Sequence, residues 1–237
     1  MEKGLFEAYT KNVYIGVFTA PFPIEEVPAD QCILESRVAF KVKQMPEKYM
    51  KDFYCKNYVN GSVQVKGVYF FNSYAAVVIS DSIRVCIVFG DSMNMTVYSI
   101  DIGDTFQNTL VTLLQRIYVR CPLFYIEWFE QTYPHHKLSS MKTCYVLQAV
   151  HTIQDSKTAG NERCELSTQL FEQMVMIKNT TDNTVFAFCF GDDVLFLLSN
   201  VEDFLILSTS FELCSEVRNK LRTMFELTTQ EGAVINF

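Results

Sequence analysis

The stretch that decides the fold is 186–198, which reads FAFCFGDDVLFLL. Two apolar runs flank the polar corner 191–193, and a short corner of this kind is typical of two neighbouring antiparallel strands. A third apolar run follows at 204–207, and apolar residues then recur at helical spacing along 213–225. From 186 to 225 the sequence therefore predicts a hairpin, a further strand and an amphipathic helix.

The first half of the chain carries the same order of features. The apolar run 77–89 is interrupted by the acidic corner 80–82, a strand is predicted at 96–102, and a helix is predicted over 105–117. This agreement favours two similar modules in tandem, related as a pseudo-repeat. The alternative is that any α+β domain with a strand meander followed by a helix gives the same pattern, because few residues are identical between the halves.

The remaining sequence completes this organisation. Alternating apolar residues and turn signals predict strands at 13–19, 32–43, 63–79 and 144–153, and helices at 47–56 and 165–173. The predicted fold class is α+β, with antiparallel sheets each covered on one face by helices. The predicted domains are a first module at 1–130, a linker at 131–142 and a second module at 143–237.

Composition limits the classes of partner and compartment. The chain has 237 residues, is 49% hydrophobic and carries a net charge of −7, with 20 scattered Lys and Arg residues. Nucleic acid is therefore predicted to be an unlikely partner, unless an acidic exterior hides a basic concave face. Eight cysteines without a CxxC pair indicate free thiols in the cytoplasm or nucleus. No apolar run approaches the roughly 20 residues of a transmembrane helix.

Carboxylates are the first candidates for chemistry, because they serve as metal ligands and as acid–base pairs. Asp101 with Asp104 could form an acid–base pair, but Asp104 is explained by the start of the predicted helix. The remaining acidic residues are interpreted as turn formers rather than as metal ligands. They are Asp192, Asp193, Glu202 and Asp203.

Histidine and cysteine give two further candidate sites. The adjacent His135 and His136 are interpreted as a solvated pair in the linker rather than as metal ligands. Cys144 and His151 lie on one predicted strand at an odd separation, which places them on opposite faces. No nucleotide-binding or hydrolase motif is present. The sequence therefore predicts no catalytic residues, no metal, no cofactor and no enzyme.

An aromatic cluster is the candidate interface, because Trp and Tyr are enriched at the centres of protein interfaces. The alternative is that three of these residues, which follow helical spacing, complete the core of the first module. The cluster consists of Phe124, Tyr125, Trp128, Phe129 and Tyr133.

The leading functional prediction is a non-enzymatic adaptor or complex subunit that binds a protein partner or a second copy of itself through sheet edges and this aromatic surface. The alternatives are a nucleic-acid-associated, clamp-like scaffold and a hydrolase whose site is assembled from distant residues. The order of three strands and a helix resembles longin-type trafficking modules, which implies heterodimerisation through sheet edges. The duplication resembles clamp-like proteins built from two related halves, which implies a basic concave face.

Overall fold

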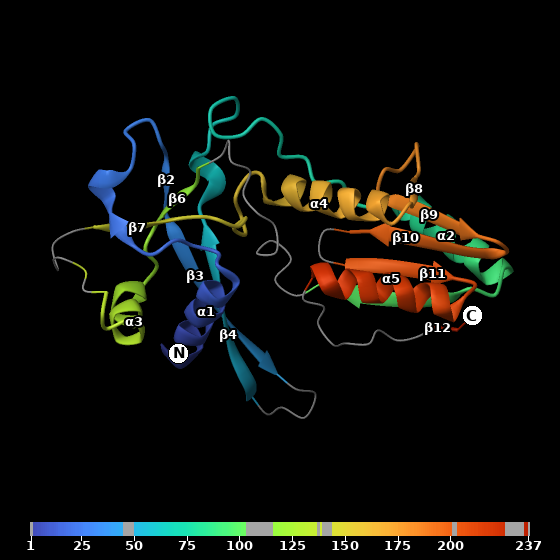
Figure 1. The fold of residues 1–237 in the computed structure, drawn as a ribbon, viewed down its shortest axis with the longest axis horizontal. Coiled ribbons are helices and arrows are strands. Elements are labelled where there is room, and N and C mark those ends of the chain that lie inside the picture. The colour runs from blue at the N-terminus through green and yellow to red at the C-terminus, as the bar shows by residue number, and fades with distance from the viewer. Residues whose placement is uncertain are drawn as a thin grey trace. The chain divides into compact units, whose positions relative to one another are not determined.

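The chain folds into two compact units, each built from two segments. Unit 1 comprises 1–73 and 109–159, and unit 2 comprises 74–108 and 160–237. The computed structural model describes residues 2–44, 50–102, 116–136, 138, 144–200, 203–225 and 235–236. Its mixture of helices and sheets confirms the α+β class (Figure 1). The division at 131–142 stays a prediction. Among the described residues, no helix has the length and apolar character needed to cross a membrane.

Unit 1 combines a small sheet, a long hairpin and two helices. The sheet has the strand order β1-β7-β6-β2, and β3 pairs with β4 as a separate antiparallel hairpin (Figure 1). The elements are α1 (Glu2–Ile15), β1 (Phe22–Pro23), η1 (Ile24–Glu26), β2 (Ile33–Leu34), β3 (Ser36–Gln44), β4 (Met50–Val59), η2 (Gly61–Val63), β6 (Tyr118–Arg120), α3 (Tyr125–Thr132) and β7 (Tyr145–Gln148).

The helices of unit 1 meet through aromatic side chains. Tyr9 of α1 packs edge-on against Tyr125 of α3, with ring centroids 5.0 Å apart, and lies 5.5 Å from the ring of Trp128. The Tyr9 hydroxyl donates a hydrogen bond of 2.5 Å to the carbonyl of Leu123. Leu5 and Leu147 complete this core, which joins α1, α3 and β7.

Unit 2 is built around a six-stranded sheet with the order β12-β5-β11-β10-β9-β8, and its strand pairs are all antiparallel. Figure 1 shows these strands side by side. The elements are α2 (Ser80–Ser92), β5 (Thr96–Asp101), α4 (Ala159–Gln173), β8 (Ile177–Lys178), β9 (Val185–Phe190), β10 (Asp193–Ser199), β11 (Asp203–Ser208), α5 (Phe211–Met224) and β12 (Ile235–Asn236).

The two faces of this sheet have different cover. Alternate residues of β5 and β11, including Ile100 and Phe204, pack under α4 and α5 in the main core. On the other face, α2 packs against the Leu207 end of β11. A methyl group on Gly90 of α2 would lie 2.8 Å from Leu207 Cδ2, so the helix approaches the strand closely there. Ser210 caps α5 by accepting from Leu213 N at 3.3 Å.

The sequence correctly predicts the part of unit 2 that follows residue 185. The hairpin is β9–β10, the third strand is β11, and the helix is α5. The strand predicted at 96–102 is β5. The helix predicted over 105–117 lies largely outside the described residues.

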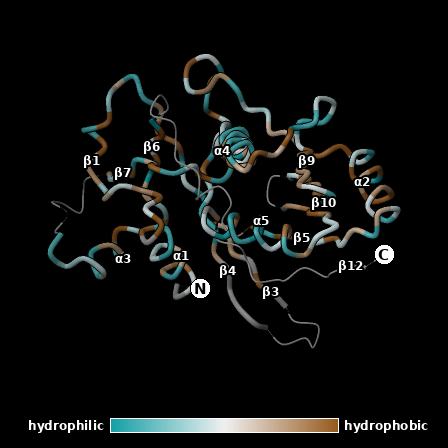
Figure 2. The backbone as a smooth tube through the Cα atoms, turned by 45° about the vertical axis from the view of Figure 1, so that its right-hand side comes forward, coloured by the Kyte–Doolittle hydropathy of each residue, from teal (hydrophilic) through white to brown (hydrophobic). Residues whose placement is uncertain are grey.

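The run 77–89 differs from its prediction. The sequence predicts two strands around 80–82, whereas the structure forms the helix α2 there. The run is apolar at 83 and at 85–89, and Figure 2 shows brown segments in α2 beside teal ones. Periodicity does not separate a buried helix from a buried strand in so short an apolar run. The tandem pseudo-repeat is therefore not confirmed.

Three other stretches also differ. The strand predicted at 13–19 begins inside α1, and the helix predicted at 47–56 overlaps β4, whose pairing with β3 overrides its local propensity. At 63–79 the structure has the end of η2 and an isolated bridge between Lys66 and Phe70 instead of the predicted strand meander.

Candidate functional site

Two carboxylates meet at one end of the sheet of unit 2. Asp101 is the last residue of β5, Asp203 is the first residue of β11, and the two are direct partners in the antiparallel register. Side chains of register partners lie on the same face of a sheet, with Cβ atoms about 4.5–5.5 Å apart. The fold therefore holds these two carboxyl groups against each other.

The backbone on both sides of Asp203 is fixed by hydrogen bonds and by burial. Asn200 N donates to Asp203 O at 2.8 Å and closes the turn between β10 and β11. Ser199 N donates to Thr184 O at 2.8 Å, which ties β10 to the loop before β9. Phe204, the next residue, is buried on the opposite face of the sheet. Asp203 is thus anchored from both sides of its position in the chain.

The carboxyl group of Asp203 is perturbed by that of Asp101. The pKa of Asp203 is raised by partial burial, by the charge of Asp101 and by a hydrogen bond to the Asp101 side chain. Two carboxylates in such proximity resist ionising together, and a divalent cation between them relieves the repulsion. Carboxylate oxygens are also the ligands that Mg²⁺ prefers.

This end of the sheet is open on the carboxylate face. Ser99, which shares that face with Asp101, is exposed, and Asp203 is exposed as well. The close contact of α2 lies at Leu207, four residues along β11 and so about 13 Å away. Among the described residues, the side chain of Asp203 is therefore accessible on the face that α4 and α5 leave uncovered.

The residues present fit a cation, and the described ones supply two of its ligands. Among the described residues, no group of three or more His, Cys, Asp or Glu side chains converges. Glu202 precedes Asp203 and Asp104 follows Asp101 by three positions, and both lie outside the described residues. Mg²⁺ commonly binds one or two protein carboxylates together with substrate phosphates, so a pair is a sufficient protein contribution.

The other acidic pair lies elsewhere. Asp192 and Asp193 form the turn between β9 and β10, beside Gly191 with its positive φ of 62°. Thr209 Oγ1 lies 3.4 Å from Asp193 Oδ1 and accepts from Val194 N at 2.9 Å. The seven residues of β10 separate this turn from the β10–β11 turn by about 20 Å. The turn-forming interpretation fits Asp192 and Asp193, whereas Asp203 has the further role of facing Asp101.

The histidine and cysteine candidates lie in unit 1. His135 and His136 are exposed after α3, and the His136 ring packs 6.1 Å from Phe129. Cys144 is exposed before β7, and His151 N donates to Val17 O at 3.3 Å. Within the described part of the chain, neither pair belongs to a group of three or more side chains that could hold a metal.

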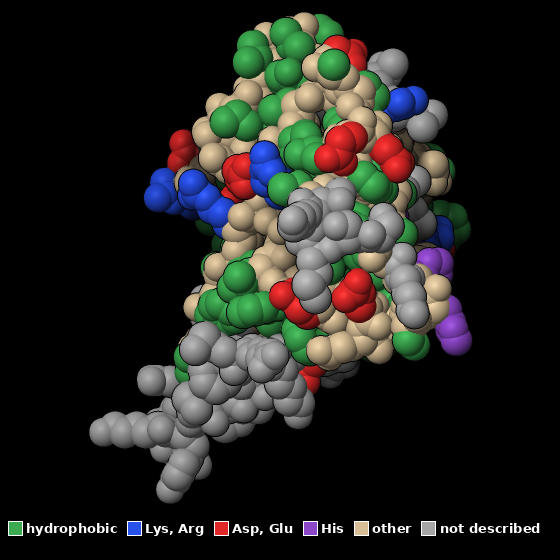
Figure 3. All heavy atoms as spheres, turned by 90° about the vertical axis from the view of Figure 1, so that its left-hand side faces the viewer, with side chains coloured by type: hydrophobic (Ala, Val, Ile, Leu, Met, Phe, Trp, Pro, Cys, Tyr) green, Lys and Arg blue, Asp and Glu red, His purple; other side chains and the backbone are tan. Residues whose placement is uncertain are grey.

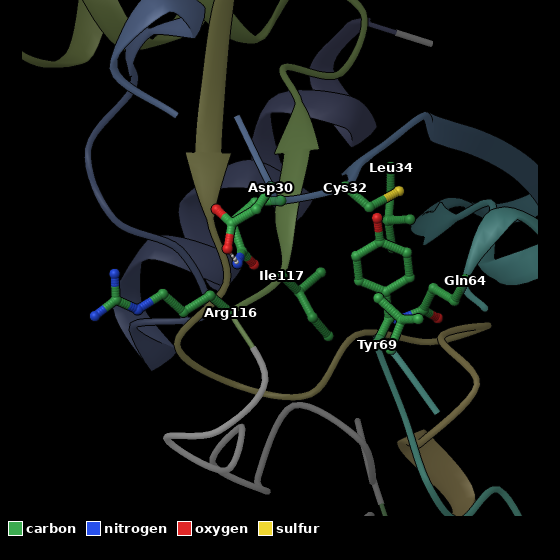
Figure 4. Close-up of a pocket in the computed structure, with 9 residues that line it drawn as sticks. Asp30, Cys32, Leu34, Gln64, Tyr69, Arg116 and Ile117 are labelled. Atoms are coloured by element: carbon green, nitrogen blue, oxygen red, sulfur yellow. Dashed lines mark hydrogen bonds between the residues drawn. The ribbon is translucent and has the colours of Figure 1, made fainter. Parts of the chain in front are cut away.

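A cavity of about 240 Å³ lies in unit 1. Figure 4 shows Tyr69 and Ile117 along its walls and the Arg116 side chain extending away from Tyr69. Its carboxylate, Asp30, accepts a hydrogen bond of 3.2 Å from Gln31 Nε2. The lining residues include neither paired carboxylates nor a cysteine–histidine pair, so the cavity does not supply the distant-residue hydrolase site that the sequence left open.

The structure buries three residues of the aromatic cluster and leaves the other two at least partly exposed. Tyr125, Trp128 and Phe129 are buried in the core of unit 1, as the core alternative expects. Phe124 is half exposed with a positive φ of 56°, and Tyr133 is partly buried against Trp128 and Phe129. An interface role for these residues stays a prediction.

Two exposed cations lie on one face of the β3–β4 hairpin. Arg37 and Lys56 are exposed on one face, together with the partly buried Tyr58, because Arg37 pairs with Tyr58 and Ala39 pairs with Lys56. The opposite face, which carries Val38, packs on the core of unit 1. Figure 3 shows acidic and basic side chains interspersed on the face it draws, so the net charge does not describe every local surface.

Sequence reasoning did not pair Asp101 with Asp203. It grouped each with its neighbours in the chain, whereas the pairing depends on the register between two strands far apart in sequence. The available signal was that 96–101 (TVYSID) and 203–208 (DFLILS) are both apolar strands with an aspartate at one end. Antiparallel pairing brings such ends together.

A comparison with protein families gives a match over nearly the whole chain. Residues 21–236 match the family described as reverse transcriptase (RNA-dependent DNA polymerase). No curated protein matches the chain.

Two solved structures are similar to this chain. The telomerase from Candida albicans, in complex with a fragment of telomeric RNA, is 10% identical over 99% of this chain and 47% of that chain, with a TM-score of 0.43. The apo telomerase from Candida tropicalis, truncated from its C-terminal domain, is 8% identical over 100% of this chain and 55% of that chain, with a TM-score of 0.45. This chain spans about half the length of these structures, and no argument rests on the likeness.

The family match corrects three predictions from the sequence. The prediction of a non-enzymatic adaptor is wrong, because the family is one of polymerases. The prediction of no enzyme is wrong for the same reason. The exclusion of nucleic acid is wrong because the family is one of RNA-dependent DNA polymerases, and a net charge of −7 summed over the whole chain does not describe each local surface. Since the match spans 21–236, the chain belongs to the reverse transcriptase (RNA-dependent DNA polymerase) family.

Proposed function

We propose that this chain carries the nucleotide-transfer site of an RNA-dependent DNA polymerase, with Asp101 and Asp203 as ligands of a divalent cation. The observation that carries the proposal is their direct register pairing at the open end of the sheet. The family match supports the type of reaction, because polymerases use carboxylate-bound cations to transfer phosphoryl groups.

The proposed chemistry places each residue in a definite role. A divalent cation held by Asp101 and Asp203 would supply positive charge for the transferring phosphoryl group and would lower the pKa of a coordinated hydroxyl. Asp101 and Asp203 hold the charge that attracts the cation, and the turn hydrogen bond from Asn200 N keeps Asp203 in register. The packing of Ile100 and Phe204 on the opposite face keeps both strand ends from moving apart.

Template and primer binding is proposed for the β3–β4 hairpin. Arg37 and Lys56 supply charges for phosphate groups, and Tyr58 on the same face offers an aromatic ring for stacking on a base. Lys41 and Lys43 follow Arg37 in β3 at even spacing. The proposed reaction uses RNA, DNA and nucleoside triphosphates, so we place it in the cytoplasm or nucleus.

Primer extension tests the proposal. The purified chain is given an RNA template, a DNA primer, deoxynucleoside triphosphates and Mg²⁺ or Mn²⁺. Asp101→Asn and Asp203→Asn should each lower the extension rate by about 10²-fold or more, because each removes a charged ligand worth several kcal/mol to the transition state.

The matched control is Asp192→Asn, which removes the same charge from the other acidic turn of the sheet. It should extend the primer at the wild-type rate. Equal rates for wild type, Asp101→Asn and Asp203→Asn would contradict the proposed site, and equal losses in all three variants would show that the effect is not specific to the pair.

A further inference from the structure

A buried guanidinium lies beneath the strand that carries Asp203. Arg163 of α4 is 1% exposed and is among the largest fully buried side chains in the described structure. Its guanidinium carbon lies 4.1 Å from the ring centroid of Phe225 and 5.5 Å from that of Phe204. One side chain therefore connects α4, the start of β11 and the end of α5.

Arg163 has hydrogen-bond donors without a partner among the described residues. Nη1 donates to Ser167 Oγ, whereas among the described residues Nε and Nη2 have no hydrogen-bond partner. Burial lowers the pKa of Arg163 to about 10, which indicates an environment that disfavours the charge. A buried charge with incomplete partners weakens a fold, and an apolar side chain of similar volume is often neutral or stabilising in such a place.

The location of Arg163 gives a reason for its presence despite this cost. Phe204 directly follows Asp203, and its ring is held on another side by Phe171, with centroids 5.4 Å apart in an edge-to-face arrangement. Phe204 is also the register partner of Ser199, the last residue of β10 before the turn. A displacement of Phe204 therefore moves both the backbone of Asp203 and the turn that closes on it.

We propose that Arg163 is a positioning residue for the carboxylate pair: its planar guanidinium, which packs against both Phe225 and Phe204, fixes the start of β11 so that Asp203 stays opposite Asp101. The inference rests on the proposed function, in which this pair binds a divalent cation. It concerns orientation from the far face of the sheet, since Arg163 lies on the helix-covered face and the carboxylates lie on the open one.

Two substitutions distinguish the contribution of the planar guanidinium group from that of its charge. Arg163→Met keeps much of the volume and removes the charge, but the methionine side chain is flexible and does not fix an aromatic ring. Arg163→Lys keeps a charge without the planar group that stacks on aromatic faces. If the planar shape of the guanidinium group is what fixes the start of β11, both variants should hold Asp203 less firmly opposite Asp101. Arg163→Met should do so without a loss of stability.

The test is Mn²⁺ binding, followed by the electron paramagnetic resonance signal of free Mn²⁺, together with thermal unfolding of the same samples. Arg163→Met should weaken Mn²⁺ binding about tenfold, the loss typical when a group that orients a metal ligand is removed, while its Tm equals or exceeds that of the wild type. Arg163→Lys should also weaken binding. Leu195→Ala, a truncation in the same core at the other end of β10, should lower Tm and leave Mn²⁺ binding unchanged.

The outcomes separate this inference from the function on which it rests. Wild-type affinity in both Arg163 variants, with weak binding in Asp203→Asn, would overturn the positioning role alone. An equal loss of affinity in Leu195→Ala and Arg163→Met would also overturn it, because general destabilisation would then explain the effect. Equal Mn²⁺ binding by wild type and Asp203→Asn would overturn the proposed function and this inference with it.

Discussion

At the scale of single residues, Asp182 shows how one carboxylate can fix a distant helix. Its Oδ2 accepts a hydrogen bond of 2.9 Å from Ile79 N, the residue that caps α2. Its Oδ1 accepts from Thr184 N at 3.1 Å and from Thr184 Oγ1 at 2.6 Å. The turn before β9 is thereby tied to the first turn of α2.

This arrangement makes stability depend on pH. Burial by itself would raise the pKa of Asp182, but hydrogen bonds from the Ser82 and Thr184 side chains and from the backbone N–H groups of Ile79 and Thr184 outweigh it and lower the pKa. A carboxyl whose pKa is depressed on folding adds stability above its ordinary pKa of 3.8, and this stability is lost as the pH falls through the lower folded value. Asp182→Asn should therefore unfold at lower temperature than wild type near pH 7, and the difference should shrink below pH 3.8.

Thermal unfolding followed by circular dichroism over this pH range checks the prediction. Asp81→Asn is the control, because Asp81 is an exposed carboxylate of the same helix, paired with Arg84 on the surface. A constant gap between Asp182→Asn and wild type at every pH would mean that ionisation of Asp182 does not contribute.

Residue-level prediction from sequence succeeded for turns and failed for the site. Local neighbours predict a hairpin turn at Asp192 and Asp193, and in the structure Asp192 lies in the turn between β9 and β10 while Asp193 begins β10 directly after it. The same reasoning predicts a turn role for Asp203, but its partner Asp101 comes from a strand that no local pattern links to it. Side-chain type and spacing carry local information, whereas this pair depends on the order of strands in the sheet.

At the scale of elements, α3 shows a helix whose sequence supports two interpretations. Its aromatic residues at helical spacing could face a partner or the core, and the structure places Trp128, which is 3% exposed, in the core of unit 1. The rings of Tyr9 and Tyr125 lie 5.5 Å and 5.2 Å from that of Trp128. Trp128 therefore joins α3 to α1.

Trp128→Ala should lower the free energy of unfolding by about 3–5 kcal/mol, because it leaves a large cavity between these helices. Urea denaturation measures the change. Phe124→Ala is the matched control, since Phe124 is 48% exposed at the start of the same helix and should change stability by about 0.5 kcal/mol or less. Similar losses in the two variants would argue against Trp128 as the anchor of α3.

Element prediction failed where tertiary contacts decide the structure. The run 77–89 and the run 186–198 look alike in sequence, yet one is α2 and the other is β9–β10. The absence of a side chain at Gly90 lets α2 approach Leu207, and Asp182 supports its first turn, so the helix depends on contacts outside the run. The prediction of the α+β class is still correct, because it depends on composition and on the elements that the sequence predicts correctly, such as β9, β10, β11 and α5.

At the scale of the whole molecule, charge placement matters more than net charge. The exposed Arg37 and Lys56 share one face of the β3–β4 hairpin. If they contact phosphates, each releases counterions on binding, and the affinity for nucleic acid falls steeply as salt rises.

The double variant Arg37→Ser/Lys56→Ser should reduce the slope of log K against log salt by about 1.4–1.8, which is the loss of two phosphate contacts. Fluorescence anisotropy with a labelled RNA–DNA hybrid measures the slope. Lys66→Ser/Arg84→Ser removes two other exposed cations and should leave the slope unchanged. Identical slopes in the two double variants would exclude a specific role for the hairpin.

The strand order of unit 2 has a consequence for synthesis of the protein. β5 pairs with β11 on one side and with β12 on the other, and both partners lie after residue 202. While the ribosome is still adding those residues, β5 has two open edges, which are prone to pairing with other chains. A chain that stops before residue 203 also lacks half of the carboxylate pair. A product truncated before residue 203 is therefore both prone to aggregation and without one of the two residues of the proposed metal site.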